Sequence, residues 1–278
     1  MFQKFLQPSE FARLLACTSS AVILALGLCS CQTAVTSSDV TGSLGEKAET
    51  GRAADPRRDV EVFEARYRAN PKDAEAALQY GKALRATGQK SQAVAVLEQA
   101  TIAHSGNKAL LAGYGRALAD NGNFQQAFDV LGRAHTPDNP DWRILSAQGA
   151  ALDQLGRFEE ARQYYSSALK IAPGQPSVLS NLGLSYVLSK DLPQAEETLR
   201  RAHSRAGSDA RVRANLALVV GLRGNMAEAE KIAKVDLPPE EAAANVAQLK
   251  LMLSRKENAR AEMGSKGKMP VAASGRSD

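Results

Sequence analysis

Apolar and polar positions between Trp142 and Gln175 follow a helical spacing that predicts two amphipathic helices joined by a tight turn. The first helix places four residues on one face, Leu145, Gln148, Gly149 and Leu152. Gly156 interrupts the pattern and Pro173 ends the second helix. The face of that second helix consists of Phe158, Ala161, Tyr165 and Ala168. Small residues facing each other at Gly149 and Ala161 are expected to bring the two helices close together.

The same pattern returns every 34 residues. The small position of the first helix recurs as Gly81, Gly115, Gly149 and Gly183. The small position of the second helix recurs as Ala93, Ala127, Ala161, Ala195 and Ala229. A large position follows it as Leu97, Leu131, Tyr165 and Leu199. The turn recurs as Gly88, Gly122, Gly156 and, after one skipped copy, Gly224. Four series in phase are hard to obtain by chance, so the chain is interpreted as a repeat array.

This length and order of positions resemble the tetratricopeptide repeat, a helix–turn–helix unit. The resemblance implies an all-α, right-handed α-solenoid of about five repeats with helical caps, over residues 58–256. The expected copies are 74–107, 108–141, 142–175, 176–209 and a degenerate 210–237, which departs from the others at Arg213, Ala217 and Asp236. A single helix from Arg58 to Asn70 is expected to cap the start. A helix over 240–255 after Pro238 and Pro239 is expected to close the end, followed by a disordered tail at 257–278.

The first thirty residues resemble a bacterial secretory signal, because Lys4 and Arg13 precede an apolar run from Leu14 to Leu28. That run is shorter than the about 20 residues of a transmembrane helix. Its end, Leu28-Cys29-Ser30-Cys31, resembles the lipobox of bacterial lipoproteins, which implies cleavage after residue 30 and lipidation of Cys31. Gln32 then resembles the outer-membrane sorting default, and residues 31–57 are interpreted as anchor and flexible tether. An ordinary signal peptide or an uncleaved anchor is the alternative.

Composition argues against several classes of function. The formal net charge of +5 is modest, and basic residues are interleaved with acidic ones, so nucleic acid is not an expected partner. All three cysteines precede Gln32, which leaves the rest of the chain without a thiol. Metalloprotease, serine-hydrolase and phosphate-loop motifs are missing from the sequence. An enzyme, a metal and a cofactor are therefore not expected, and membrane contact is expected through the lipid anchor only.

The resemblance implies that the first helices line a concave groove that binds a protein partner. Positions that face the groove in the family carry over to a basic end at Lys82, Arg85, Arg116 and Arg143, and to an apolar end at Leu184, Leu188, Leu218 and Leu222. Polar groove positions carry over to Asp120, Ser146, Asp153 and Ser180. The alternative for the four leucines is packing against the C-terminal cap.

Leader, lipobox, short tether and isolated array together resemble the TadD family of lipoproteins from the tight-adherence (Flp) pilus system. This resemblance implies a non-catalytic periplasmic scaffold, anchored to the outer membrane, that assists assembly of a pilus or its secretin. Two alternatives stay open. One is a pilotin for a type IV pilus secretin, and the other is an adaptor lipoprotein that regulates cell-wall enzymes or outer-membrane assembly.

Overall fold

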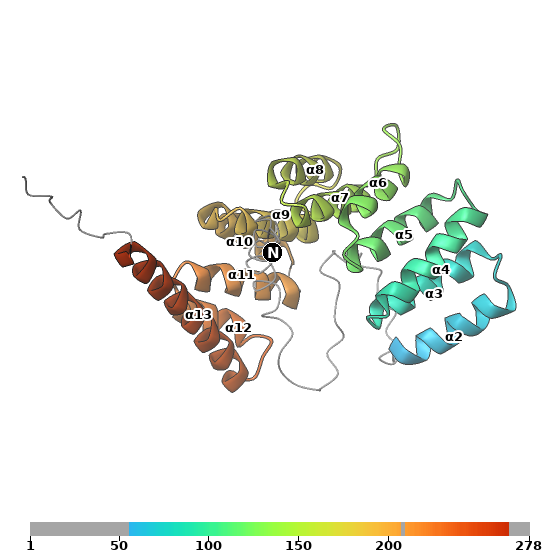
Figure 1. Ribbon diagram of the computed structural model, residues 1–278. Coiled ribbons are helices and arrows are strands. Elements are labelled where there is room, and N and C mark those ends of the chain that lie inside the picture. The colour runs from blue at the N-terminus through green and yellow to red at the C-terminus, as the bar shows by residue number, and fades with distance from the viewer. Residues whose placement is uncertain (1–55, 207–208, 267–278) are drawn as a thin grey trace, which may run out of the picture. The chain divides into compact units, whose positions relative to one another are not determined.

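A computed structural model describes residues 56–206 and 209–266, which form a succession of helices (Figure 1). The expected signal peptide, Cys31 and nearly all of the expected tether lie outside the described residues. Within the described part of the chain the only β-type pairing is a single bridge between Thr136 and Asn139. The all-α architecture expected from the sequence is therefore confirmed.

Two helices fall within each of the five expected repeats, of which the last is the shorter stretch 210–237. The first helices of the repeats are α3 (Ala74–Ala86), α5 (Lys108–Asp120), α7 (Trp142–Gln154), α9 (Pro176–Leu188) and α11 (Ala210–Leu222). The second helices are α4 (Lys90–Ala103), α6 (Phe124–Arg133), α8 (Phe158–Ile171), α10 (Leu192–Ala206) and α12 (Met226–Ala233). Each helix packs on the next, and each first helix also packs on the first helix of the following repeat. Contacts of this kind between neighbours define a solenoid.

The glycine series marks the closest contact within each repeat. A Cβ atom placed on Gly81 would lie 2.5 Å from Leu97 Cγ, and one on Gly149 would lie 2.7 Å from Tyr165 Cε1. Gly115 faces Leu131 and Gly183 faces Leu199 in the same way. Non-bonded carbon atoms pack at about 3.5–4.0 Å, so only a glycine fits at these positions. The close approach expected from the sequence is confirmed, and the large residue of the second helix is its partner.

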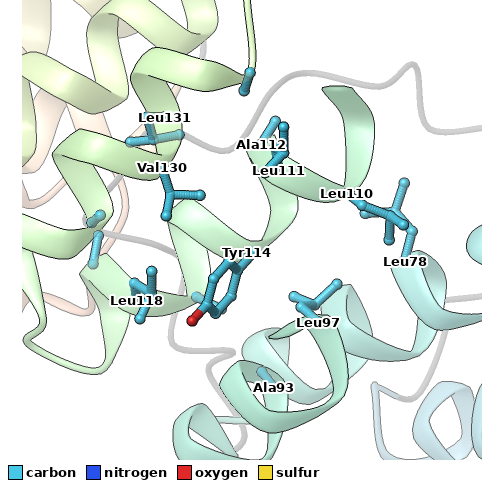
Figure 2. Close-up of a cluster of buried hydrophobic side chains, with 14 of the residues drawn as sticks. Leu78, Ala93, Leu97, Leu110, Leu111, Ala112, Tyr114, Leu118, Val130 and Leu131 are labelled. Carbon is cyan, nitrogen blue, oxygen red and sulfur yellow. The ribbon is translucent and has the colours of Figure 1, made fainter. Parts of the chain in front are cut away.

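The core continues from one repeat into the next. Figure 2 shows Leu97, Leu110 and Leu131 directed into one cluster that also includes Leu78 and Tyr114. Leu97, Leu110 and Leu131 are fully buried. Full burial of a leucine side chain stabilises a fold by about 1.5–3 kcal/mol. The cluster draws on α3 to α7, so no repeat in this part buries its apolar face alone.

The inter-helix turn keeps one backbone geometry even where the sequence departs from glycine. Gly88, Gly122 and Gly156 have φ angles between +75° and +87°. In the fourth repeat the same position is Lys190, which has a φ of +67°. A side chain in this left-handed region is unfavourable by about 1–2 kcal/mol. The fourth repeat therefore keeps the turn geometry of the others, although a lysine replaces the glycine.

A polar residue caps the first helix in four of the five repeats. Asp73, Asn107, Asp141 and Asp209 each accept hydrogen bonds from backbone N–H groups in the first turn of the helix that follows. Such a cap contributes about 1 kcal/mol. The caps lie 34 residues apart, except in the fourth repeat, where Gln175 precedes Pro176. Each repeat boundary is therefore set locally as well as by packing.

The N-terminal helix α2 (Pro56–Ala69) packs on α3. Its Val60, Phe63 and Tyr67 cover the first core cluster, and the ring of Tyr67 stacks on Tyr80 with 5.6 Å between centroids. This is the covering role expected of a helix that begins the array.

The C-terminal end of the array is closed by α13 (Pro239–Lys266). Leu249 packs so closely on α11 that a Cβ atom on Gly221 would lie 2.5 Å from its Cδ2. The sequence prediction ended this helix at Arg255 and placed a disordered tail from 257, and this was wrong for residues 256–266. That stretch is rich in Lys, Glu, Ala and Arg, which favour helix, and contains no proline.

Two residues of the last repeat that depart from the repeat pattern, Arg213 and Asp236, form a pair. Arg213 replaces the apolar residue found one repeat earlier at Leu179, and Asp236 replaces Ala202. Arg213 Nε donates a hydrogen bond of 2.7 Å to Asp236 Oδ2, and a second bond joins Nη2 to Oδ1. This contact lowers the pKa of Asp236. A bidentate ion pair therefore occupies the place of an apolar contact at the last repeat.

Candidate functional site

The first helices of consecutive repeats lie side by side and share a surface, called here the first-helix face. Polar side chains 35 residues apart join them across repeats: Arg85 Nε donates to Asp120 Oδ2 (2.6 Å), Asn181 Nδ2 to Ser146 Oγ (3.1 Å) and Asn215 Nδ2 to Ser180 Oγ (2.9 Å). These bonds run from α3 to α5, from α9 to α7 and from α11 to α9. Several polar residues that were expected to contact a partner, Arg85, Asp120, Ser146 and Ser180, therefore join neighbouring repeats instead.

The four basic residues expected at one end of the groove have different surroundings. Lys82 and Arg143 are exposed, and Arg116 is partly buried. The side chain of Arg85 is only 8% exposed because it is paired with Asp120 between α3 and α5. Arg85 therefore contributes to the contact between repeats, whereas Lys82 and Arg143 present their charges to solvent.

The four leucines expected at the apolar end are all partly buried. Leu222 packs on the core cluster of the last repeats together with Val246 of α13, which supports the packing alternative for this residue. Leu184, Leu188 and Leu218 belong to none of the buried clusters found among the described residues. These three leucines leave an apolar area on α9 and α11.

Asp153, expected to line the groove, is instead buried between three helices. Its carboxylate accepts a hydrogen bond of 2.8 Å from the Tyr165 hydroxyl of α8 and one of 2.6 Å from the Ser185 hydroxyl of α9. Burial raises the pKa of Asp153 to about 6, although both hydrogen bonds and the charge of Arg162 act in the opposite direction. Asp153 therefore links the third repeat to the fourth.

The second repeat contains a cavity of about 560 Å³ that the sequence analysis did not predict. The helix α6 has 10 residues where α4 and α8 have 14, and the chain continues through a connection that includes Pro137 and Pro140. Its lining includes Lys108, Ala109, Ala112, His135, Trp142 and Arg143. Sites that hold ligands commonly have volumes of about 300–1,000 Å³. The sequence signal was Pro137, which stands where the first and third repeats still have the last residue of α4 and of α8.

A smaller hollow adjoins this cavity and shares Trp142 and Arg143 with it. Its other polar lining residues are Arg116, Ser146, Ser177 and Asn181. The guanidinium of Arg143 lies 4.8 Å from the centre of the Trp142 ring, in a cation–π contact. The two hollows together extend over α5, α7 and α9 on the first-helix face.

Residues 56–206 and 209–266 contain no group of three or more His, Cys, Asp and Glu side chains arranged to hold a metal ion. Over the same residues, every helix is too short or too polar to cross a bilayer.

The repeated stretch identifies the family of this chain. Two family models, both described as "Tetratricopeptide repeat", match residues 78–140 and 116–176 and residues 154–219. Together they span residues 78–219, about half of the chain. The chain belongs to the tetratricopeptide-repeat family. Members of this family are typically protein-interaction scaffolds. None of the curated proteins compared matches the sequence.

Solved structures share the fold at low sequence identity. PilW, a widely conserved type IV pilus biogenesis factor, is 20% identical with a TM-score of 0.60, over 69% of this chain and 91% of PilW. A tetratricopeptide repeat protein from Parabacteroides merdae is 18% identical with a TM-score of 0.56, over 79% of this chain and 88% of that one. A chain of the APC/C hetero-tetramer Cut9–Hcn1 is 18% identical with a TM-score of 0.60, and this chain covers 40% of its length. At these identities the likeness is one of fold.

Proposed function

We propose that this protein is a non-catalytic scaffold that binds a segment of a partner protein on its first-helix face. The observation that carries the proposal is the surface itself. It combines exposed cations, a cavity and three leucines outside the buried clusters on adjacent helices. Binding surfaces commonly place apolar anchors inside a polar rim. Stacked repeats create extended surfaces of the kind that bind partner segments.

The partner is expected to be a component of a pilus machine in the bacterial envelope. The resemblance to the TadD family supports a secretin or another assembly component of the tight-adherence (Flp) pilus. The fold shared with PilW, a pilus biogenesis factor, is compatible with this assignment. It also favours a second candidate function, biogenesis of a type IV pilus. The two candidate functions are distinguished by the secretin that the protein binds, that of the Flp pilus or that of the type IV pilus.

The apolar part of the surface is tested by a Leu184→Glu, Leu188→Glu double variant. Loss of a well-buried apolar anchor costs about 2 kcal/mol or more of binding, and two carboxylates add a desolvation cost. The variant is expected to lose at least 95% of the partner captured from solubilised envelope. Capture is measured by mass spectrometry, after circular dichroism has shown an unchanged melting temperature.

The matched control is an Ile102→Glu, Ile171→Glu double variant, which changes charge equally on second helices. Both isoleucines are exposed, at 69% and 42%, so the control is expected to capture as much partner as the unmodified chain. If the folded leucine variant keeps its partner, the leucines do not take part in binding. If the control loses the partner as well, the loss is an effect of the added charge and does not locate binding at the leucines.

The proposed location is the periplasmic side of the outer membrane, through a lipid on Cys31. The supporting observation is the Leu28-Cys29-Ser30-Cys31 run after a short apolar segment. Cys31→Ser is expected to abolish lipidation, so that the protein leaves the membrane pellet or remains as its precursor. Two or more acyl chains are needed for stable anchoring, so loss of the site has a large effect. Fractionation and intact mass measure both outcomes.

Cys29→Ser is the control for the lipidation site, because it changes a neighbouring thiol and leaves Leu28, Ser30 and Cys31 in place. Its mass and fractionation are expected to match those of the unmodified protein. An unchanged mature mass in the Cys31→Ser variant would exclude this residue as the lipidation site.

A further inference from the structure

The cavity of the second repeat is a local departure from the 34-residue pattern. Where α4 and α8 continue for 14 residues, α6 stops at Arg133, and the connection to α7 turns between Thr136 and Asn139. The α5 side of the cavity is lined by Ala109 and Ala112, whose short side chains leave the space open. In the first repeat the equivalent positions hold the larger Glu75 and Leu78.

Positive charge surrounds the opening. Lys108 and Arg143 line the cavity, and Arg116 lines the hollow beside it. Lys108 Nζ donates a 2.7 Å hydrogen bond to the Arg133 carbonyl, which uses one of its three donors. The one acidic lining residue, Asp141, accepts a hydrogen bond from the backbone N–H of Arg143 as the cap of α7, and its Oδ1 also lies 3.9 Å from Arg143 Nη1. Three cations thus stand against one carboxylate around the opening, so the net charge there is positive.

The outline of the site favours an extended chain. The cavity leads past Trp142 and Arg143 to Ser146, Ser177 and Asn181, so the surface runs from the second repeat to the fourth. Asn181 donates one N–H to Ser146, and its remaining amide groups suit a peptide backbone. A compact small molecule would fill the cavity and leave these groups without a partner.

We propose that this cavity is a specificity pocket that receives a large apolar side chain from an extended segment of the partner, with a neighbouring Asp or Glu of that segment paired to Arg143. The inference rests on the proposed scaffold function and names the chemistry of the bound segment. Trp142 and the alanines contact the apolar side chain. Arg143, fixed over the Trp142 ring, offers its guanidinium to the carboxylate.

Trp142 makes the proposal directly testable, because it is the only tryptophan of the chain. A random twelve-residue peptide library is selected on the full chain, and selected peptides are titrated while Trp142 emission is recorded. Selected sequences are expected to place Phe, Tyr or Leu within two residues of Asp or Glu. Binding is expected to change the emission and to weaken as salt rises. Ligands of other composition, ligands that leave the emission unchanged, or no ligands at all would overturn the proposal.

Two variants locate the binding. Arg143→Gln is expected to weaken a selected peptide at least tenfold. Arg211→Gln is the matched control, since Arg211 occupies the same repeat position and follows the same kind of aspartate cap. It is expected to change affinity less than twofold. Equal losses in both variants would assign the effect to overall charge and contradict a pocket at Arg143.

Ala109→Phe fills the pocket and separates this inference from the scaffold function. It is expected to abolish binding of the selected peptides and to reduce capture of the natural partner. If capture is unchanged while peptide binding is lost, the natural partner does not use the pocket, and the scaffold function stands. If the leucine double variant also keeps its partner, neither the pocket nor the leucines bind it, and the proposed location of binding on the first-helix face is wrong as well.

Discussion

Gly149→Leu is expected to lower the free energy of unfolding by about 3 kcal/mol or more. Even a Cβ atom at this position would lie 2.7 Å from Tyr165 Cε1 and 3.1 Å from the Ala161 carbonyl oxygen. Tyr165 cannot move aside easily, because it is 1% exposed and its hydroxyl donates to Asp153. Overpacking of a core usually costs about 1–3 kcal/mol, and a rigid aromatic neighbour places this site at the upper end.

Three further glycine variants show whether the loss arises from this contact. The three nearest atoms to the added Cβ of Gly183→Ala all belong to the aliphatic side chain of Leu199, whereas that of Gly149→Ala also meets the Ala161 carbonyl oxygen, so a smaller loss than in Gly149→Ala is expected. Gly132→Ala, on α6, places its Cβ atom 3.4 Å from Gln148 Nε2 and is expected to be neutral or stabilising, because alanine favours helix. Thermal and urea unfolding measure all four variants. Equal stability of Gly149→Leu and the unmodified protein would contradict the packing described.

The loss at Gly149 is expected to reach beyond the third repeat. Tyr165 belongs to a cluster that includes Val178 of α9 and contacts Phe128 of α6. In a solenoid, stability is shared through the interfaces of neighbouring repeats. Amide hydrogen exchange of the variant is therefore expected to show faster exchange in α6 and α9 as well as in α7 and α8.

Asp153→Asn is expected to change how stability depends on pH. The pKa of Asp153 is raised from 3.8 to about 6 by burial, so the folded state binds its proton more tightly than the unfolded state does. The stability that this proton contributes is fully present below about pH 3.8 and is lost as the pH rises through about 6. A shift of this size corresponds to roughly 3 kcal/mol. Asparagine is neutral throughout and keeps the size of the side chain.

The stability of Asp153→Asn relative to the unmodified protein is therefore expected to rise by roughly 2.5 kcal/mol between pH 4 and pH 8. Urea unfolding at several pH values gives this difference, and groups that titrate in both proteins cancel. The hydroxyls of Tyr165 and Ser185 can rotate to suit the amide. A difference that does not vary with pH would mean that Asp153 keeps an ordinary pKa, with Arg162 offsetting its burial.

The positions and boundaries of most helices could be predicted from the sequence, because the signals that determine them are local. The 34-residue period, the glycines at the turns and the prolines at the boundaries each act over one or two helical turns. Even Lys190, which breaks the glycine series, adopts the turn geometry that its neighbours require. The end of α13 was the exception, because the sequence after Arg255 contains no strong stop signal.

The accessible surface was decided only by the tertiary structure. Arg85 and Asp153 occupy family groove positions, but the first is paired with Asp120, 35 residues away, and the second with Ser185, 32 residues away. Spacing within one helix cannot show such pairings, because they depend on how neighbouring repeats are stacked. The cavity beside Trp142 has the same origin: the prolines shorten α6, but the space exists because α5 presents alanines to it. The sequence by itself therefore determined the helices and their order, while packing between repeats determined which side chains remain available to a partner.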